Sequence, residues 1–247
     1  MTVPNLIFDE TGTILRGMKD KTITSVNIPN WVTKISKCAF DGCTSQQPIG
    51  IPNSVTEIGQ EAFKNCSSLQ SVEIPESVAV IGYGAFCDSP SLKTINVAED
   101  NEDYSSADGI LFNKEQSVLL QFPAGKNIKS YSIPDSVTRI GWSAFSDCTS
   151  LQFADIPDSV TMIGGKAFEG CSSLEAINIP DSVTKIENAT FRGCSSLETI
   201  DIPGRSLCLS CLLLFKSLFG LLPEPLLLLL LLLQNVVIAL KMVGAGF

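Results

Sequence analysis

Cysteine is the residue type with the widest chemical repertoire in this sequence of 247 residues, which contains nine cysteines and no histidine. Cys43 and Cys66 are 23 residues apart, and the same interval separates Cys148, Cys171 and Cys194. Side chains that repeat at one position of stacked units point the same way, which is unfavourable for disulfide geometry. We therefore expect this column to be a small, buried, apolar ladder.

The remaining reactive groups form no recognisable catalytic or metal-binding set. Cys208 and Cys211 have C-x-x-C spacing, but neither a second pair nor a histidine accompanies them, so a zinc or redox role is not expected. The absence of histidine removes Ser-His and Cys-His nucleophile pairs and imidazole metal ligands. Carboxylate pairs remain, but the sequence singles out none. We predict a protein that is not an enzyme and has no metal or cofactor.

Two further patterns have simpler explanations than ligand binding. The acidic residues between positions 100 and 108 lack the spacing and central glycine of an EF-hand, so they are interpreted as a solvated turn. Glycosylation sequons begin at Asn65 and Asn188 and would matter only in a secreted chain. The first residues show no basic and apolar signal-peptide pattern, which makes chance occurrence the preferred interpretation.

The charge balance restricts the partners. The chain has 26 acidic and 17 basic side chains, a formal net charge of -9. A nucleic-acid binder needs a basic face to meet phosphate, so we predict no nucleic-acid partner. Only 17% of the residues are charged, which also argues against a disordered chain.

An internal repeat organises most of the chain. The dipeptide Ile-Pro recurs at intervals of 23 residues, with one interval of 59, and begins at Ile28, Ile51, Ile74, Ile133, Ile156, Ile179 and Ile202. The surrounding frame is L-x-x-(V/I)-x-I-P-x-S-V-T-x-I-G-x-x-A-F-x-x-C-x-S. A fixed period of this length indicates a solenoid of stacked coils.

Each part of the frame predicts an element. The segment L-x-x-V-x-I is a short strand ended by proline, and V-T-x-I-G is a second short strand. The segment x-x-A-F-x-x-C predicts one helical turn that carries Phe40, Phe63, Phe86, Phe145, Phe168 and Phe191. Serine after Pro-x is expected to hydrogen-bond to the backbone at the corner. The fold prediction is a mostly β repeat solenoid, with two short strands and a short helical turn per coil.

The same frame resembles the BspA-type leucine-rich repeat family, over about residues 21–203. The resemblance implies a right-handed superhelix and a role in adhesion or partner recognition. Residues 92–127 are similar to the family's enlarged repeat, in which a D-G-(V/I)-L-F-N strand pairs with an L-x-x-(F/Y)-P-A-G-K strand. The expected organisation is an N-terminal cap at 1–22, a leucine-rich-repeat solenoid at 23–203 and a hydrophobic tail at 204–247.

The polar positions around the first strand are the candidate binding surface. If they share one face of the sheet, they form a mixed, mostly acidic strip for a protein or cell-surface ligand. A face kept polar for solubility alone, in a structural surface scaffold without a specific ligand, is the alternative. The candidate residues are Gln70, Glu73, Lys93, Lys129, Gln152, Asp155, Glu175, Asn178, Glu198 and Asp201.

The tail breaks the frame after Pro203 and contains eight consecutive leucines from Leu226 to Leu233. Its apolar segments, 207–222 and 226–240, are both shorter than the ~20 residues of a membrane-spanning helix. Three interpretations stay open: a membrane anchor or re-entrant hairpin, the product of a shifted reading frame or retained intron, and a helical cap on the last coil. An anchor would place the protein at a membrane or cell surface through residues 207–247; otherwise a cytoplasmic location is expected. The ligand and the oligomeric state are not determined by the sequence.

Overall fold

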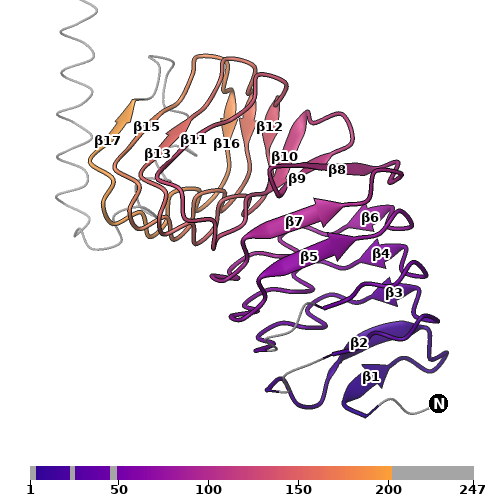
Figure 1. Ribbon diagram of the computed structural model, residues 1–247. Helices are drawn as coiled ribbons and strands as arrows, with labels where there is room; N and C mark the ends of the chain where they lie inside the picture. Colours follow the sequence, from indigo (N-terminus) through magenta and orange to yellow (C-terminus); the bar gives the residue numbers. More distant parts are fainter. Residues whose placement is uncertain (1–3, 23–25, 45–48, 202–247) are drawn as a thin grey trace, which may run out of the picture.

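The computed structural model describes residues 4–22, 26–44 and 49–201, and they form a β-solenoid (Figure 1). Each regular coil contributes up to two short strands. The strands of the V-T-x-I segments are β3 (Lys34–Ile35), β4 (Glu57–Ile58), β6 (Val80–Ile81), β12 (Arg139–Ile140), β14 (Met162–Ile163) and β16 (Lys185–Ile186). The strands that precede Ile-Pro are β5 (Ser71–Ile74), β7 (Thr94–Val97), β11 (Ser130–Ser132), β13 (Phe153–Asp155), β15 (Ala176–Asn178) and β17 (Thr199–Asp201).

An antiparallel hairpin stands at the N-terminal end of the solenoid. Its strands are β1 (Leu6–Phe8) and β2 (Ile14–Met18), and β2 pairs in parallel with β3. The hairpin thereby extends the sheet β1-β2-β3-β4-β6 and covers the first coil. Leu6, Leu15 and Met18 are buried against the core of that coil, which is the position expected of a cap.

The enlarged repeat contains three antiparallel strands, β8 (Tyr104–Ala107), β9 (Ile110–Asn113) and β10 (Val118–Gln121). The pairing of β9 with β10 confirms the predicted pairing of the D-G-I-L-F-N and L-Q-F-P-A-G-K segments. β10 then pairs in parallel with β12 and restarts the regular stack. Both kinds of sheet are interrupted here, so the molecule contains β5-β7 and β11-β13-β15-β17 as separate sheets (Figure 1).

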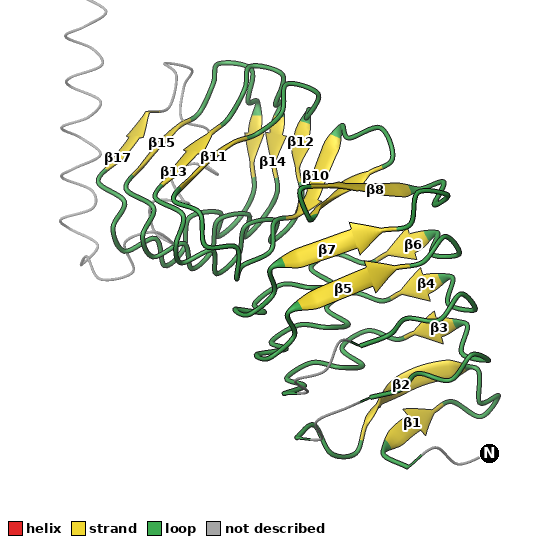
Figure 2. Ribbon diagram, viewed as in Figure 1, coloured by secondary structure: helices red, strands yellow, loops and turns green. Residues whose placement is uncertain are grey.

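The predicted helical turn is wrong. The described residues contain no helix, and Figure 2 shows strands joined by turns and loops. In the first coil Cys38 and Gly42, on either side of Phe40, both have positive φ, 56° and 72°. Left-handed residues at both ends stop a right-handed helix from forming. The N–H of Phe40 instead donates to the carbonyl of Ala62 in the next coil, at 2.7 Å.

Phenylalanine ladders fill the interior. Phe40, Phe63 and Phe86 stack with ring centroids 4.9 and 5.4 Å apart. A second ladder has centroid separations of 4.8–5.6 Å and consists of Phe122, Phe145, Phe168 and Phe191. The two ladders belong to two separate clusters of buried residues, one on each side of the enlarged repeat.

Serine and threonine columns tie successive coils together. Ser77 Oγ donates to the carbonyl of Val55 at 2.8 Å, and Ser159 Oγ donates to that of Val137 at 2.7 Å. These bonds confirm the predicted serine–backbone hydrogen bond, and they show that the acceptor belongs to the preceding coil. Thr161 Oγ1 bonds in the same way to the carbonyl of Thr138, at 3.3 Å. Each coil is therefore fastened to its neighbour at the corner after Ile-Pro.

The expected tail at 204–247, including its predicted helix, lies outside the described residues. Within the described part of the chain, no helix has the length and hydrophobicity required to cross a bilayer.

Removing one ring from a ladder is expected to destabilise the solenoid strongly. Phe63 is fully buried between Phe40 and Phe86, so Phe63→Ala should lower the free energy of unfolding by about 3–5 kcal/mol. Phe153→Ala is the matched control, because that side chain is 45% exposed and its loss should cost less than about 1 kcal/mol. Urea denaturation of both variants measures the difference, and equal losses would contradict the ladder as the source of stability.

Candidate functional site

The four-stranded sheet β11-β13-β15-β17 presents one residue per coil in a straight row. Its parallel register aligns Ser132, Asp155, Asn178 and Asp201. Asp155 and Asn178 are exposed, whereas Ala154 and Ile177 between the outer positions are buried. The alternation along each strand therefore places the polar row on the outer face and the apolar row in the core.

The structure divides the predicted strip into two parts. Seven of the candidate residues lie on or just before the strands of the four-stranded sheet: Lys129, Gln152, Asp155, Glu175, Asn178, Glu198 and Asp201. The other three, Gln70, Glu73 and Lys93, lie on or beside β5 and β7. Because the enlarged repeat separates the two sheets, the ten residues do not form one continuous row.

Neighbouring polar side chains are linked across coils. Gln152 Nε2 donates to Glu175 Oε1 at 2.9 Å, and Asn96 Nδ2 donates to Glu73 Oε1 at 2.8 Å. Each bond joins residues 23 positions apart. These links fix the orientation of the side chains before any partner arrives, which reduces the entropy lost on binding.

An exposed aromatic ring lies on the same face. Phe153 is 45% exposed and is aligned with Ser130 on one side and Ala176 on the other. Its small neighbours leave the ring accessible beside the polar row. Sequence reasoning missed this residue, although the signal was present: the same repeat position holds serine, threonine or alanine in other coils.

The cysteine column has a structural role. Cys171 Sγ donates to the carbonyl of Phe145 at 3.0 Å, and Cys194 Sγ donates to that of Phe168 at 3.1 Å. Ser89 occupies the same position in its coil and donates to the carbonyl of Phe63, also at 3.0 Å. The expected buried ladder is thus confirmed, with a thiol–carbonyl bond to the preceding coil added to it.

Burial makes these thiols unreactive. It raises the pKa of Cys66 to about 12, and likewise raises the pKa of Cys194 to about 12. The thiolate is the nucleophile and the metal ligand, so the column has neither property near neutral pH. In the described part of the chain, no group of three or more Cys, His, Asp or Glu side chains is arranged to hold a metal ion. Cys208 and Cys211 lie outside that part.

Acidic side chains meet on the turns where the two ladders come together. Ser146 Oγ donates to Asp88 Oδ1 at 2.7 Å and thereby joins the two halves of the solenoid. Burial, together with the negative charges of Asp88 and Glu169, raises the pKa of Asp147. Lys64, 3.5 Å from Asp88, partly offsets this repulsion.

The comparisons with known proteins fit this architecture. The model of the BspA-type leucine-rich repeat region matches residues 18–113 and 121–210, in six copies. These ranges cover more than half of the sequence, and the chain belongs to this family of leucine-rich-repeat proteins. Leucine-rich-repeat solenoids are typically non-catalytic and generally bind proteins through their surfaces. None of the curated proteins matches the sequence.

Two solved structures show the same fold. A leucine-rich repeat protein from Eubacterium ventriosum ATCC 27560 is 30% identical, with a TM-score of 0.68 over 75% of this chain. The pneumococcal vaccine antigen PcpA is 23% identical, with a TM-score of 0.53 over 78% of this chain. The matches cover 51% and 64% of those proteins, so this chain spans about half the length of the first.

Cysteine labelling should follow burial. At pH 8 iodoacetamide is expected to label Cys38, which is partly exposed, and to leave Cys66 and Cys194 unmodified in the folded protein. All three should react in urea. Mass spectrometry of the digested protein gives the modified sites, and rapid native labelling of Cys66 would contradict a packed ladder.

Asparagine at position 147 should stabilise the protein in a pH-dependent way. The pKa of Asp147 is raised in the folded state, so its ionisation opposes folding at pH 7. That cost disappears as the pH falls through the folded pKa and below the unfolded one. Asp147→Asn should therefore raise Tm at pH 7, and its advantage should shrink toward pH 3. Asp158→Asn, at an exposed site, is the control, and a pH-independent difference in Tm would refute the electrostatic origin.

Proposed function

We propose that this chain is a non-catalytic recognition module that binds an extended segment of a partner protein along the sheet β11-β13-β15-β17. The in-register row on the outer face of this sheet carries the proposal. Neighbouring strands lie about 4.8 Å apart, so the row offers one polar contact per coil to a segment lying across the strands. Adhesion at a cell surface is one setting in which such recognition would operate.

The charge of this face selects the partner. Asp155 and Glu198 are exposed and Glu175 is partly exposed, whereas Lys129 is the one basic candidate on this sheet. A complementary segment would therefore be basic. Complementary charge accelerates encounter and excludes wrong partners more than it raises affinity.

Phe153 would supply the apolar contact that charge alone lacks. Exposed aromatic residues commonly dominate the binding energy of an interface, and polar residues around them exclude water. Phe153 lies two positions from Asp155 on the same outer face of β13. We expect a partner segment to place an apolar side chain on this ring and basic side chains on the acidic row.

Selection from a displayed library of peptides of about eight residues tests this assignment. The selected peptides should be rich in lysine and arginine. The combined change Asp155→Lys and Glu175→Lys should weaken their binding at least about tenfold, as should Phe153→Ala. Raising the salt concentration should weaken binding to the wild-type chain.

Glu73→Lys is the matched control, since Glu73 is an exposed acid at the equivalent repeat position on the separate sheet β5-β7. Its effect on peptide binding should stay within about twofold. Fluorescence anisotropy of one selected peptide gives all the affinities. Enrichment of acidic peptides, or equal binding to the wild type and the double variant, would overturn the proposal.

A further inference from the structure

The enlarged repeat has a shortened corner. In a regular coil five positions lead from the strand isoleucine to the ladder phenylalanine, as from Ile140 to Phe145. In the enlarged repeat, Leu119 pairs with Ile140 and Phe122 stacks on Phe145 at 5.1 Å. Only three positions separate Leu119 from Phe122, so this corner lacks two residues that its neighbours have.

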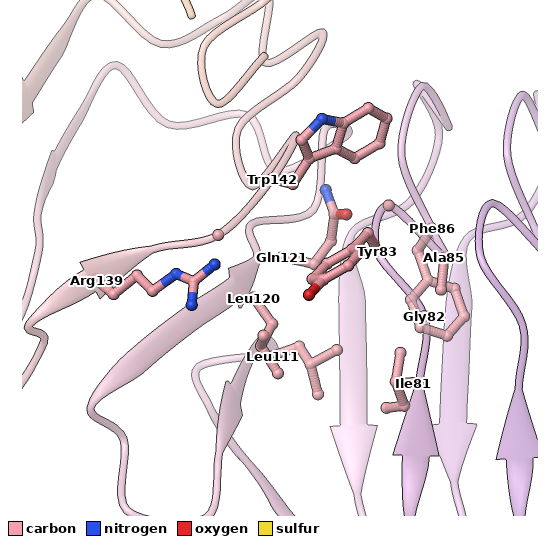
Figure 3. Close-up of a pocket in the computed structure, with 12 residues that line it drawn as sticks. Ile81, Gly82, Tyr83, Ala85, Phe86, Leu111, Leu120, Gln121, Arg139 and Trp142 are labelled. Carbon is pink, nitrogen blue, oxygen red and sulfur yellow. The ribbon is translucent and has the colours of Figure 1, made fainter. Parts of the chain in front are cut away.

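The missing residues leave a cavity between the corners of the adjoining coils, which we call the junction pocket. It has a volume of about 100 Å³ and is lined by residues 81–86, 111, 120–121, 139 and 141–142. Figure 3 shows Leu120 and Gln121 between the two corners, with Tyr83 on one side and Trp142 on the other. The pocket is therefore a product of the irregular unit and does not repeat along the solenoid.

The tryptophan wall is held in place by glycines. A Cβ at Gly84 would lie 2.5 Å from Cζ3 of Trp142, and a Cβ at Gly165 would lie 3.2 Å from its Cδ1. Gly84 also has φ +59°, a conformation that suits glycine. The ring of Trp142 thus fits between two coils that lack side chains at the points of contact. Tyr83 is 66% exposed and stands at the rim.

Arg139 supplies the single charge of the pocket. It is the only charged residue among those that line it, and Figure 3 shows its guanidinium extending toward the cavity above Leu120. Its Nε is buried and has no hydrogen-bond partner among the described residues. A buried N–H without an acceptor is unfavourable, above all on a charged group.

The nearby carboxylate is committed elsewhere. Glu187 Oε1 lies 2.7 Å from Lys185 Nζ, and its Oε2 accepts the backbone N–H of Gly165 at 3.1 Å. The hydrogen bond with Lys185 is the main reason why the pKa of Glu187 is lowered, and the charge of Arg139 contributes less. None of the ion pairs between described residues includes Arg139.

We propose that the junction pocket binds a small monocarboxylate whose apolar body is about the size of one benzene ring. The carboxylate would accept hydrogen bonds from the Arg139 guanidinium, including the buried Nε, and the apolar body would lie among Leu111, Leu120 and Trp142. Guanidinium and carboxylate have matching planar geometry. A single cation balances one negative charge, which disfavours a phosphate dianion, and the volume excludes anything much larger than one ring.

Phenylacetate is the probe that tests the pocket, with tryptophan fluorescence of the full chain as the readout. Saturable quenching is expected, because Trp142 lines the site. Arg139→Met should weaken the apparent affinity at least about tenfold. This variant should fold normally, because the next coil has Met162 at the paired position. Arg192→Met, which removes an exposed arginine, should bind as the wild type does.

Two further comparisons define the chemistry. Benzyl alcohol, which keeps the ring and lacks the charge, should bind the wild type at least about tenfold more weakly than phenylacetate and should not distinguish Arg139→Met from it. Tyr83→Gln, which copies Gln60 of the preceding coil, should weaken phenylacetate binding through loss of the rim. An acetylated tripeptide ending in phenylalanine, as free acid and as amide, separates a peptide C-terminus from a free metabolite as the source of the carboxylate.

Absence of saturable quenching by phenylacetate at 10 mM would overturn the proposal, with ~10 mM marking the weak limit for so small a ligand. Equal affinity of the wild type and Arg139→Met would also overturn it. Neither result would bear on the strand-face binding proposed above, because Asp155 and Phe153 do not line this pocket.

Discussion

The structure depends on one constraint: the backbone of each coil hydrogen-bonds to the coil before and after it. The N–H of Phe63 donates to the carbonyl of Ala85, just as that of Phe145 donates to Ala167, both at 2.7 Å. Such bonds can continue only if every coil has the same length and shape. Equal residues then fall above one another, and the aromatic, thiol and hydroxyl ladders follow from the backbone register.

The enlarged repeat is the one place where the described coils do not match. Three antiparallel strands replace a regular turn, both kinds of sheet stop, and the buried residues separate into two clusters. A mismatch of this kind cannot be filled by ladder residues, because they fit only equal neighbours. Leu120 and Gln121 span the shortened corner, and the junction pocket remains between Tyr83 and Trp142. Irregularity in a repeat protein thus creates a concave site that regular coils do not provide.

Much of the regular part was predictable because its pattern reports directly on contacts. Ser77 and Cys171 recur at fixed positions, and both hydrogen-bond to the preceding coil. The helical turn was predicted wrongly, because the spacing of alanine, phenylalanine and cysteine suits one helical turn and says little about φ. The binding strip was predicted as one row, whereas the enlarged repeat divides it between two sheets. Phe153 was visible as a break in its column but was not recognised.

The sequence by itself determined the family, the solenoid and the identity of the buried columns, because a residue and its counterpart 23 positions later are neighbours in space. Only the tertiary structure decided what the irregular unit does. The pairing of Leu119 with Ile140 and the stacking of Phe122 on Phe145 together reveal the shortened corner. Neither contact follows the period of the repeat, so no pattern in the sequence predicts that the corner brings Arg139 and Trp142 to one cavity with Tyr83.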